Sequence, residues 1–206
     1  MHKKLITIGA SGHGKVVADI AEKLHRYEEI AFLDDNAALK ECMGYPVVGK
    51  SDEIEKYQND ADFFVAIGNA EIRKKVMEHL KERNVSIPTL IHPAAVVGRH
   101  VTIGEGTVVM AGAVINSDTV IGTGCIINTC ASMDHDCRVG DYVHVAVGAH
   151  LCGTVEVGQS TWIGAGSIVS NNVTIYGECM IGAGAVVIKD IKEVGTYVGS
   201  PAKKIK

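Results

Sequence analysis

One short run, Met133-Asp134-His135-Asp136-Cys137, holds residues of the types that general acid–base chemistry needs. A carboxylate beside an imidazole fixes the tautomer of the ring and stabilises the imidazolium that forms, which suits a general base near neutral pH. No serine nucleophile motif accompanies the run, and no His-Glu-x-x-His or comparable metal spacing occurs. The pattern favours direct transfer with His135 as base, and we predict no metal site. The alternative is a surface histidine at a corner, and Asp134 and Asp136 both remain candidates for the orienting carboxylate.

A second set of polar residues follows three predicted strands near the N-terminus. The first strand ends in the glycine-rich run Gly9–Lys15, the second in Asp34-Asp35 and the third in Gly68-Asn69, with Arg73 one turn into the next helix. Glycines allow close backbone approach to a phosphate, and a helix N-terminus offers free N–H groups to an anion. Open α/β sheets bind ligands at the carboxyl ends of their strands, where an acidic side chain can accept from a ribose hydroxyl. We therefore predict a nucleotide site, and the alternative is a set of plain turns.

The elements that carry this second set alternate between short apolar runs and charged helical stretches. We predict strands at 5–8, 30–33 and 63–67 and helices at 15–26, 52–57 and 70–83. This order is typical of a small Rossmann-like α/β domain with a parallel sheet. For the last helix, Asn69 is the expected N-cap, and the expected apolar face is Ile72, Val76 and Leu80 with Met77 alongside.

The remainder of the chain has a hydrophobic repeat of six residues. This period fits neither a helix nor a simple alternating strand, but it is typical of a hexapeptide β-helix. Glycine often follows the aliphatic residue, and we expect positive φ there. The position two before the aliphatic residue is small or β-branched, as at Ala113, Cys125 and Ala149. The seventeen aliphatic or Met positions are Ile91, Val97, Ile103, Val109, Ile115, Ile121, Ile127, Met133, Val139, Val145, Leu151, Val157, Ile163, Val169, Ile175, Ile181 and Val187.

Length and composition bound the remaining possibilities. The chain has 206 residues, 47% of them hydrophobic, and a net charge of −4, which is ordinary for one or two globular domains and gives no indication of nucleic-acid binding. We place the domains at 1–86 and 87–206. No apolar run approaches a membrane span, and Leu5–Ile8 is too short for a signal peptide, so we expect a cytoplasmic protein without membrane insertion. The six cysteines include no Cys-x-x-Cys pair and are expected to be reduced, packed thiols.

These motifs together carry a family resemblance. The hexads and the run Gly199–Lys203 resemble the acetyl- and acyltransferases of the left-handed β-helix superfamily. Gly9–Gly14, Asp34-Asp35, Ala66–Asn69 and His135-Asp136-Cys137 are similar to one branch, the nucleotide-amino-sugar N-acetyltransferases of the bacillosamine pathway, which are grouped with sialic acid O-acetyltransferases. The resemblance covers nearly the whole chain. It implies a Rossmann-like domain followed by an all-β, left-handed parallel β-helix, and the handedness comes from the resemblance alone.

The resemblance also implies roles for individual residues. It makes His135 the general base and Asp136 its acidic neighbour. His144 resembles the residue that meets acetyl-CoA near the thioester, and the alternative for it is a solvated flank residue. Ala165 and Ala183 match positions where the family backbone contacts the pantetheine arm, and some relatives have Gly at position 183. The implied nucleotide-sugar site comprises Ser11, Gly12, His13, Asp34, Asp35 and Gly68; residues 41–55 stay unassigned.

The function that this implies is acetyl transfer from acetyl-CoA to the 4-amino group of a nucleotide-linked amino-deoxy sugar, most simply a UDP sugar. The implied assembly is a homotrimer with active sites between subunits. One alternative is O-acetylation of a sialic acid or another surface-polysaccharide sugar, and another is a non-catalytic nucleotide-binding scaffold. His135, Asp136 and His144 argue against the scaffold, and the predicted nucleotide site favours the N-acetyltransferase. These residues do not distinguish UDP from GDP or CMP.

Overall fold

The computed structural model describes residues 3–206, which form two compact units. The first unit extends to Pro93 and the second runs from Ala94 to Lys206. The change of sequence pattern lies a few residues earlier, near position 86, where the last helix of the first unit has ended. Each unit is described by itself below.

The N-terminal unit is the α/β domain that the sequence predicts. Its sheet has the order β3-β4-β2-β1-β5, in which β4, β2, β1 and β5 are parallel and β3 is antiparallel to β4. The central strands are buried apolar runs, as expected of a parallel sheet. The elements are β1 (Lys4–Ile8), α1 (Gly12–Lys23), β2 (Glu29–Leu33), β3 (Glu41–Cys42), β4 (Tyr45–Gly49), the 3-10 helix η1 (Glu53–Lys56), β5 (Ala61–Val65), α2 (Ala70–Glu82) and β6 (Leu90–Ile91).

Helix α2 begins where it was predicted and buries only part of the predicted apolar face. Asn69 caps it, because its side-chain oxygen accepts a hydrogen bond from the Ile72 backbone N–H at 3.0 Å. Ile72 is 51% exposed, however, and the buried side chains are those of Arg73, Met77 and Leu80. The prediction was therefore wrong for Ile72, which faces outward, and correct for Met77 and Leu80, which are buried. The Arg73 guanidinium donates to the backbone carbonyls of Ile67 and Gly68, just before the helix, and Arg73 is buried where Ile72 is not.

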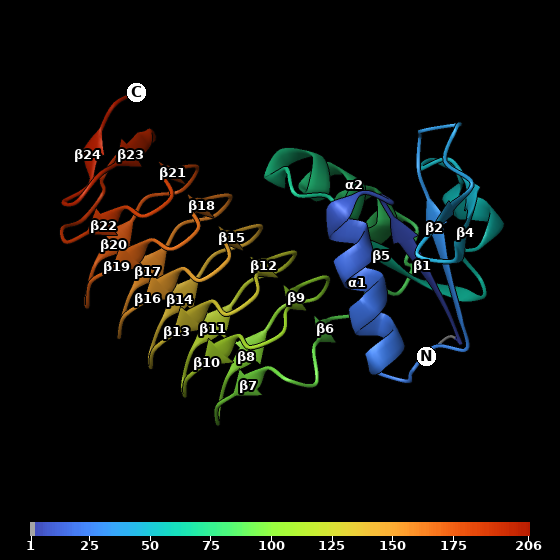
Figure 1. Cartoon of the computed structure of the whole chain (residues 1–206), viewed down its shortest axis with the longest axis horizontal. Helices are drawn as coiled ribbons and strands as arrows, with labels where there is room; N and C mark the ends of the chain where they lie inside the picture. Colours follow the sequence, from blue (N-terminus) through green and yellow to red (C-terminus); the bar gives the residue numbers. More distant parts are fainter. Residues whose placement is uncertain (1–2) are drawn as a thin grey trace. The chain divides into compact units, whose positions relative to one another are not determined.

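The C-terminal unit is a parallel β-helix of the hexapeptide-repeat, left-handed type, drawn in Figure 1 as a stack of coils. Val114 pairs with Ser132 and Ser132 with His150, so three hexads make one coil. Most strands are very short, and they form three faces. One face is β7 (Val96–Val97), β10 (Val114–Ile115), β13 (Ser132–Met133), β16 (His150–Leu151), β19 (Ile168–Val169) and β22 (Val186–Val187). The second is β8 (Thr102–Ile103), β11 (Val120–Ile121), β14 (Arg138–Val139), β17 (Glu156–Val157) and β20 (Thr174–Ile175). The third contains β9 (Val108–Val109), β12 (Ile126–Ile127), β15 (His144–Val145), β18 (Trp162–Ile163), β21 (Met180–Ile181), β23 (Thr196–Val198) and β24 (Lys203–Lys204).

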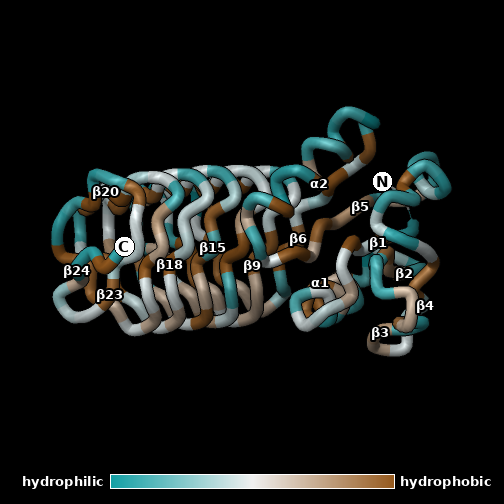
Figure 2. Tube along the Cα trace, turned by 90° about the horizontal axis from the view of Figure 1, so that it is seen from above, coloured by the Kyte–Doolittle hydropathy of each residue, from teal (hydrophilic) through white to brown (hydrophobic). Residues whose placement is uncertain are grey.

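The core of the β-helix follows the repeat. The aliphatic positions from Val109 to Val187 are buried, whereas Val97 in the first coil is 39% exposed. The small positions two residues earlier are buried as well, and their polar atoms bond to backbone carbonyls: the Thr119 hydroxyl donates to the Asp134 carbonyl at 3.0 Å. Figure 2 shows hydrophobic and hydrophilic residues alternating along the coils.

The glycines of the repeat do not have the conformation that we predicted. Gly104, like the other glycines directly after an aliphatic position, has no positive φ. Positive φ occurs two residues further on, at Gly106 and at non-glycine residues such as Asp118 and Asp136. Glycine is needed at position 104 because coils stack closely: a Cβ there would lie 2.6 Å from the backbone of Gly122.

The last coil ends in a short hairpin. Strands β23 and β24 are antiparallel, and the bond between Ser200 and Pro201 in the connection is cis. Within residues 3–206, no helix has the length and apolar character needed to cross a membrane.

Candidate active site

His135 lies at the corner between β13 and β14, with its side chain 56% exposed. Its Nδ1 is 2.7 Å from Oδ2 of Asp136, which is the left-handed corner residue with φ of 59°. The pKa of His135 is raised above its usual value, mainly by the hydrogen bond to Asp136 and next by the charge of Asp134. When Nδ1–H donates to this carboxylate, the lone pair of the neutral ring is on Nε2. The corner thus presents a basic nitrogen on an exposed ring.

Asp134 contacts the backbone of this corner rather than the ring. Its Oδ1 accepts from the His135 backbone N–H and from Asn116 Nδ2, both at 2.9 Å. These hydrogen bonds, that from Asn116 first, lower the pKa of Asp134. The two carboxylates that the sequence left open therefore have different contacts. Sequence reasoning missed Asn116, which lies one coil before Asp134 in the parallel register.

His144 lies in β15 and is only 8% exposed, so it is not a solvated flank residue. Its Nε2 is 3.1 Å from Asn128 Nδ2, and its ring centroid is 4.0 Å from that of Trp162 in the next coil. The three side chains form one polar and aromatic strip on the third face. Asn128 and Trp162 were not predicted, although counting one coil forward from His144 gives Trp162, and Asn128 lies two residues after the position one coil back.

Ala165 and Ala183 lie one coil apart at the corners that follow β18 and β21. Both are exposed, and Gly184 N–H donates to the Ala165 carbonyl at 2.8 Å. This corner joins the third face to the first, whereas His135 lies at the corner that joins the first face to the second. A single chain therefore does not bring His135 together with Ala165 and Ala183.

In the N-terminal unit, the glycine-rich turn is tightly built. Gly9 has φ of 101°, and a Cβ there would lie 2.9 Å from the Ala66 carbonyl oxygen, while a Cβ at Gly14 would overlap the Gly9 carbonyl. Ser11 occupies the N-cap position of α1 without a side-chain capping hydrogen bond. Gly12 faces open space. The turn therefore leaves the Ser11 hydroxyl and the first turn of α1 accessible, as an anion site requires.

The two acidic residues after β2 both hydrogen-bond to the protein itself. Asp34 Oδ2 accepts from the Ala10 backbone N–H at 2.8 Å and so joins β2 to the glycine-rich turn. Asp35 accepts from both the backbone N–H (3.0 Å) and the hydroxyl (2.8 Å) of Ser51, and these bonds lower its pKa. A cavity of about 150 Å³ next to them is lined by Asp34, Leu39, Lys40, Val47 and Lys50, among others. Val47 and Lys50 belong to residues 41–55, the segment to which the sequence analysis assigned no role.

Arg73 and one ring nitrogen of His13 are buried near the carboxyl ends of these strands. Arg73 is 1% exposed, and its Nη1 donates to the carbonyls of Ile67 and Gly68, both at 2.8 Å. Within the described chain, Nε2 of His13 is buried and has no hydrogen-bond partner. Burial first, and the nearby charge of Arg73 second, lower the pKa of His13 to about 4. His13 is therefore a neutral ring at physiological pH.

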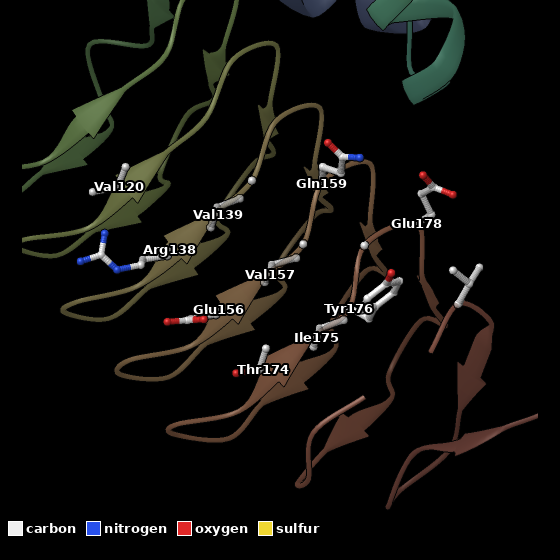
Figure 3. Close-up of a pocket in the computed structure, with 14 residues that line it drawn as sticks. Val120, Arg138, Val139, Glu156, Val157, Gln159, Thr174, Ile175, Tyr176 and Glu178 are labelled. Atoms are coloured by element: carbon white, nitrogen blue, oxygen red, sulfur yellow. The ribbon is translucent and has the colours of Figure 1, made fainter. Parts of the chain in front are cut away.

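A larger groove lies elsewhere on the β-helix, and Figure 3 shows the side chains that line it. It has a volume of about 740 Å³ and follows the second face, where Arg138, Glu156 and Tyr176 are among its lining residues. None of the residues that we predicted for catalysis or binding lines it. Among residues 3–206, no three His, Cys, Asp or Glu side chains are grouped so that they could hold a metal ion.

Comparison with known proteins identifies close relatives. A family described as the PglD N-terminal domain matches residues 4–80. The acetyltransferase domain of PglB from Neisseria gonorrhoeae FA1090 in complex with acetyl coenzyme A is 40% identical, with a TM-score of 0.97 over 100% of both chains. PerB from Caulobacter crescentus in complex with CoA and GDP-perosamine is 37% identical, with a TM-score of 0.92 over 98% of this chain and 97% of that one.

A curated relative is the UDP-N-acetylbacillosamine N-acetyltransferase of Bacillus subtilis (strain 168), which is 37% identical over 113 residues. This match covers 53% of the chain and 52% of the relative, so it spans about half the length of each protein.

The fold and these matches define the class: a hexapeptide-repeat acyltransferase with an N-terminal α/β domain. Within this class, the chain belongs to the family of N-acetyltransferases of nucleotide-linked amino sugars that carry a PglD N-terminal domain.

Proposed function

We propose that this protein transfers the acetyl group of acetyl-CoA to the 4-amino group of a nucleotide-linked amino-deoxy sugar, most simply a UDP sugar. The observation that carries the proposal is the exposed His135 ring, whose Nδ1 lies 2.7 Å from Asp136. The relatives support the substrate class, because one is a UDP-N-acetylbacillosamine N-acetyltransferase and another was solved with CoA and GDP-perosamine.

In this mechanism the sugar amine attacks the thioester carbonyl directly. His135 Nε2 accepts the amine proton as the new C–N bond forms, the C–S bond then breaks, and CoA leaves as a thiol after it takes up a proton. Asp136 keeps the Nδ1–H tautomer and stabilises the imidazolium. No covalent enzyme intermediate is needed, since holding both reactants in place lowers the entropic part of the barrier.

The two units would divide the work. The first turn of α1 at Ser11–His13, the carboxylates at Asp34 and Asp35, and Gly68 would bind the nucleotide, because they lie at the carboxyl ends of parallel strands. In the β-helix, the strip at His144 and the exposed backbone at Ala165 and Ala183 would bind acetyl-CoA.

A homotrimer would complete the active site. His135 and the Ala165–Ala183 pair occupy different corners of one β-helix, so a closed ring of copies can bring one copy's His135 corner to the next copy's acetyl-CoA surface. The exposed apolar side chains of Val120, Ile168 and Met180, one on each face, support self-association.

The test is the release of CoA thiol with a UDP-4-amino-6-deoxy sugar, compared between wild type and His135→Ala. General-base assistance contributes about 100- to 10,000-fold, so kcat should fall by that factor while both ligands still bind in calorimetry. A wild-type kcat in His135→Ala would remove His135 from the mechanism. Preferential turnover of a sialic acid hydroxyl over the sugar amine would overturn the substrate class.

A further inference from the structure

The His135 ring rests against the backbone of the next coil. A Cβ built on Gly153, one coil further along the chain, would lie 2.8 Å from both Cε1 and Nε2 of His135. The two corners are already joined, because the Thr154 backbone N–H donates to the His135 carbonyl at 2.9 Å. The place that a side chain at position 153 would occupy is therefore taken by the imidazole.

The backbone at Gly153 does not itself require glycine. Its φ is not positive, and the left-handed residue of this corner is the next one, Thr154, with φ of 59°. The equivalent position in other coils accepts side chains of different sizes. These positions, one in each coil, hold Arg99, Ser117, His135, Asn171 and Lys189. Gly153 is the exception in this series, and the contact that distinguishes it is the His135 ring.

The position of the ring determines which lone pair meets the substrate. Nδ1 is already held by Asp136, and Nε2 is one of the two ring atoms that lie over Gly153. A methyl group at position 153 would push the exposed ring outward. That would turn Nε2 away from its present direction and lengthen the contact between Nδ1 and Asp136.

We propose that Gly153 is a positioning residue for acetyl transfer: its missing side chain leaves the space in which the His135 ring lies, with Nδ1 on Asp136 and Nε2 presented to the sugar amine. This inference rests on the proposed function of His135 as general base.

The experiment is Gly153→Ala in the full-length protein, assayed by CoA release with the UDP-4-amino sugar. A misplacement of about 1 Å can cost about 100-fold in rate, so we expect kcat to fall by about 10- to 100-fold while both KM values stay within about twofold. The acid limb of the pH profile should move to lower pH, because the bond to Asp136 raises the pKa of His135. The melting temperature should stay unchanged or rise, since alanine suits an ordinary φ and an exposed ring can move aside.

Gly177→Ala is the matched control. Gly177 also lacks a positive φ, and its series at another corner holds Glu105, Thr123, Asp141 and Gln159. A Cβ there meets the Gln159 carbonyl oxygen at 3.1 Å and no catalytic group, so kcat should stay within about twofold of wild type.

A double variant separates this inference from the proposed function. If Gly153 acts through the ring, His135→Ala with Gly153→Ala should have the same residual kcat as His135→Ala alone. A wild-type kcat in Gly153→Ala beside an inactive His135→Ala would overturn the positioning role and leave the general base intact. A further loss in the double variant would also overturn it, because Gly153 would then act independently of His135. A fully active His135→Ala would instead refute the proposed function.

Discussion

His13 should make the stability of the N-terminal unit depend on pH. Its pKa is about 4 in the folded unit, against an ordinary value of 6.5 in the unfolded chain. Above pH 6.5 the ring is neutral in both states and the stability is complete. As pH falls from 6.5 towards 4, the unfolded state takes up a proton that the native state does not, so stability is lost in that window. The full loss is about 3 kcal/mol, and about 2 kcal/mol of it should be reached at pH 5.

Two optical signals separate the units in this measurement. Within the described residues, both α-helices lie in the N-terminal unit, so circular dichroism at 222 nm follows its unfolding. Trp162, the single tryptophan of the chain, lies in the β-helix and reports on that unit. Urea titrations at pH 7.5 and pH 5 should show a loss of about 2 kcal/mol in the circular dichroism transition, and His13→Gln should remove most of this loss.

The control for this titration is His25→Asn. His25 is an exposed histidine of the same unit with φ of 51°, a conformation that asparagine tolerates. It should retain the wild-type dependence on pH. The reasoning is refuted if His13→Gln and wild type lose the same free energy of unfolding between pH 7.5 and pH 5, or if the His13 ring titrates near pH 6.5 in an NMR experiment.

Three further outcomes are expected. Asp136→Asn should lower kcat by less than His135→Ala does. It should also move the acid limb of the rate profile to lower pH, since the hydrogen bond to Asp136 is the main cause of the raised pKa of His135. A larger loss of kcat in Asp134→Asn would mean that Asp134 is the orienting carboxylate. Asp35→Ala should raise the KM for the nucleotide sugar several-fold, and Ser51→Ala should raise it less; equal effects would show that Asp35 acts only through its bonds to Ser51. Gly104→Ala should destabilise the β-helix by about 1–3 kcal/mol in unfolding followed by Trp162 fluorescence, because the new Cβ would lie 2.6 Å from the Gly122 backbone. An unchanged midpoint of this unfolding transition would mean that the coils can separate freely.

The architecture could be predicted from the amino-acid sequence, because the patterns that specify both units are local in the chain. An aliphatic residue at every sixth position can build a shared core only in a β-helix, and the residues from Val109 to Val187 are buried as that period requires. Strand and helix patterns likewise predicted the α/β domain, and Asn69 was recognisable as a cap from its type and place. Motifs at strand ends also indicated where polar groups gather, since strand direction follows from the order of the elements.

Contacts between residues far apart in the chain could not be predicted, because they depend on how the folded units pack. Arg73 rather than Ile72 is buried in α2, where it reaches two backbone carbonyls, and Asp136 rather than Asp134 contacts the His135 ring. The glycines after the aliphatic positions are required by the neighbouring coil rather than by their own φ. His135 and Gly153 are neighbours because parallel coils place equivalent positions in register. The distance between them is set by the stacking of the coils, and no local pattern in the sequence records it.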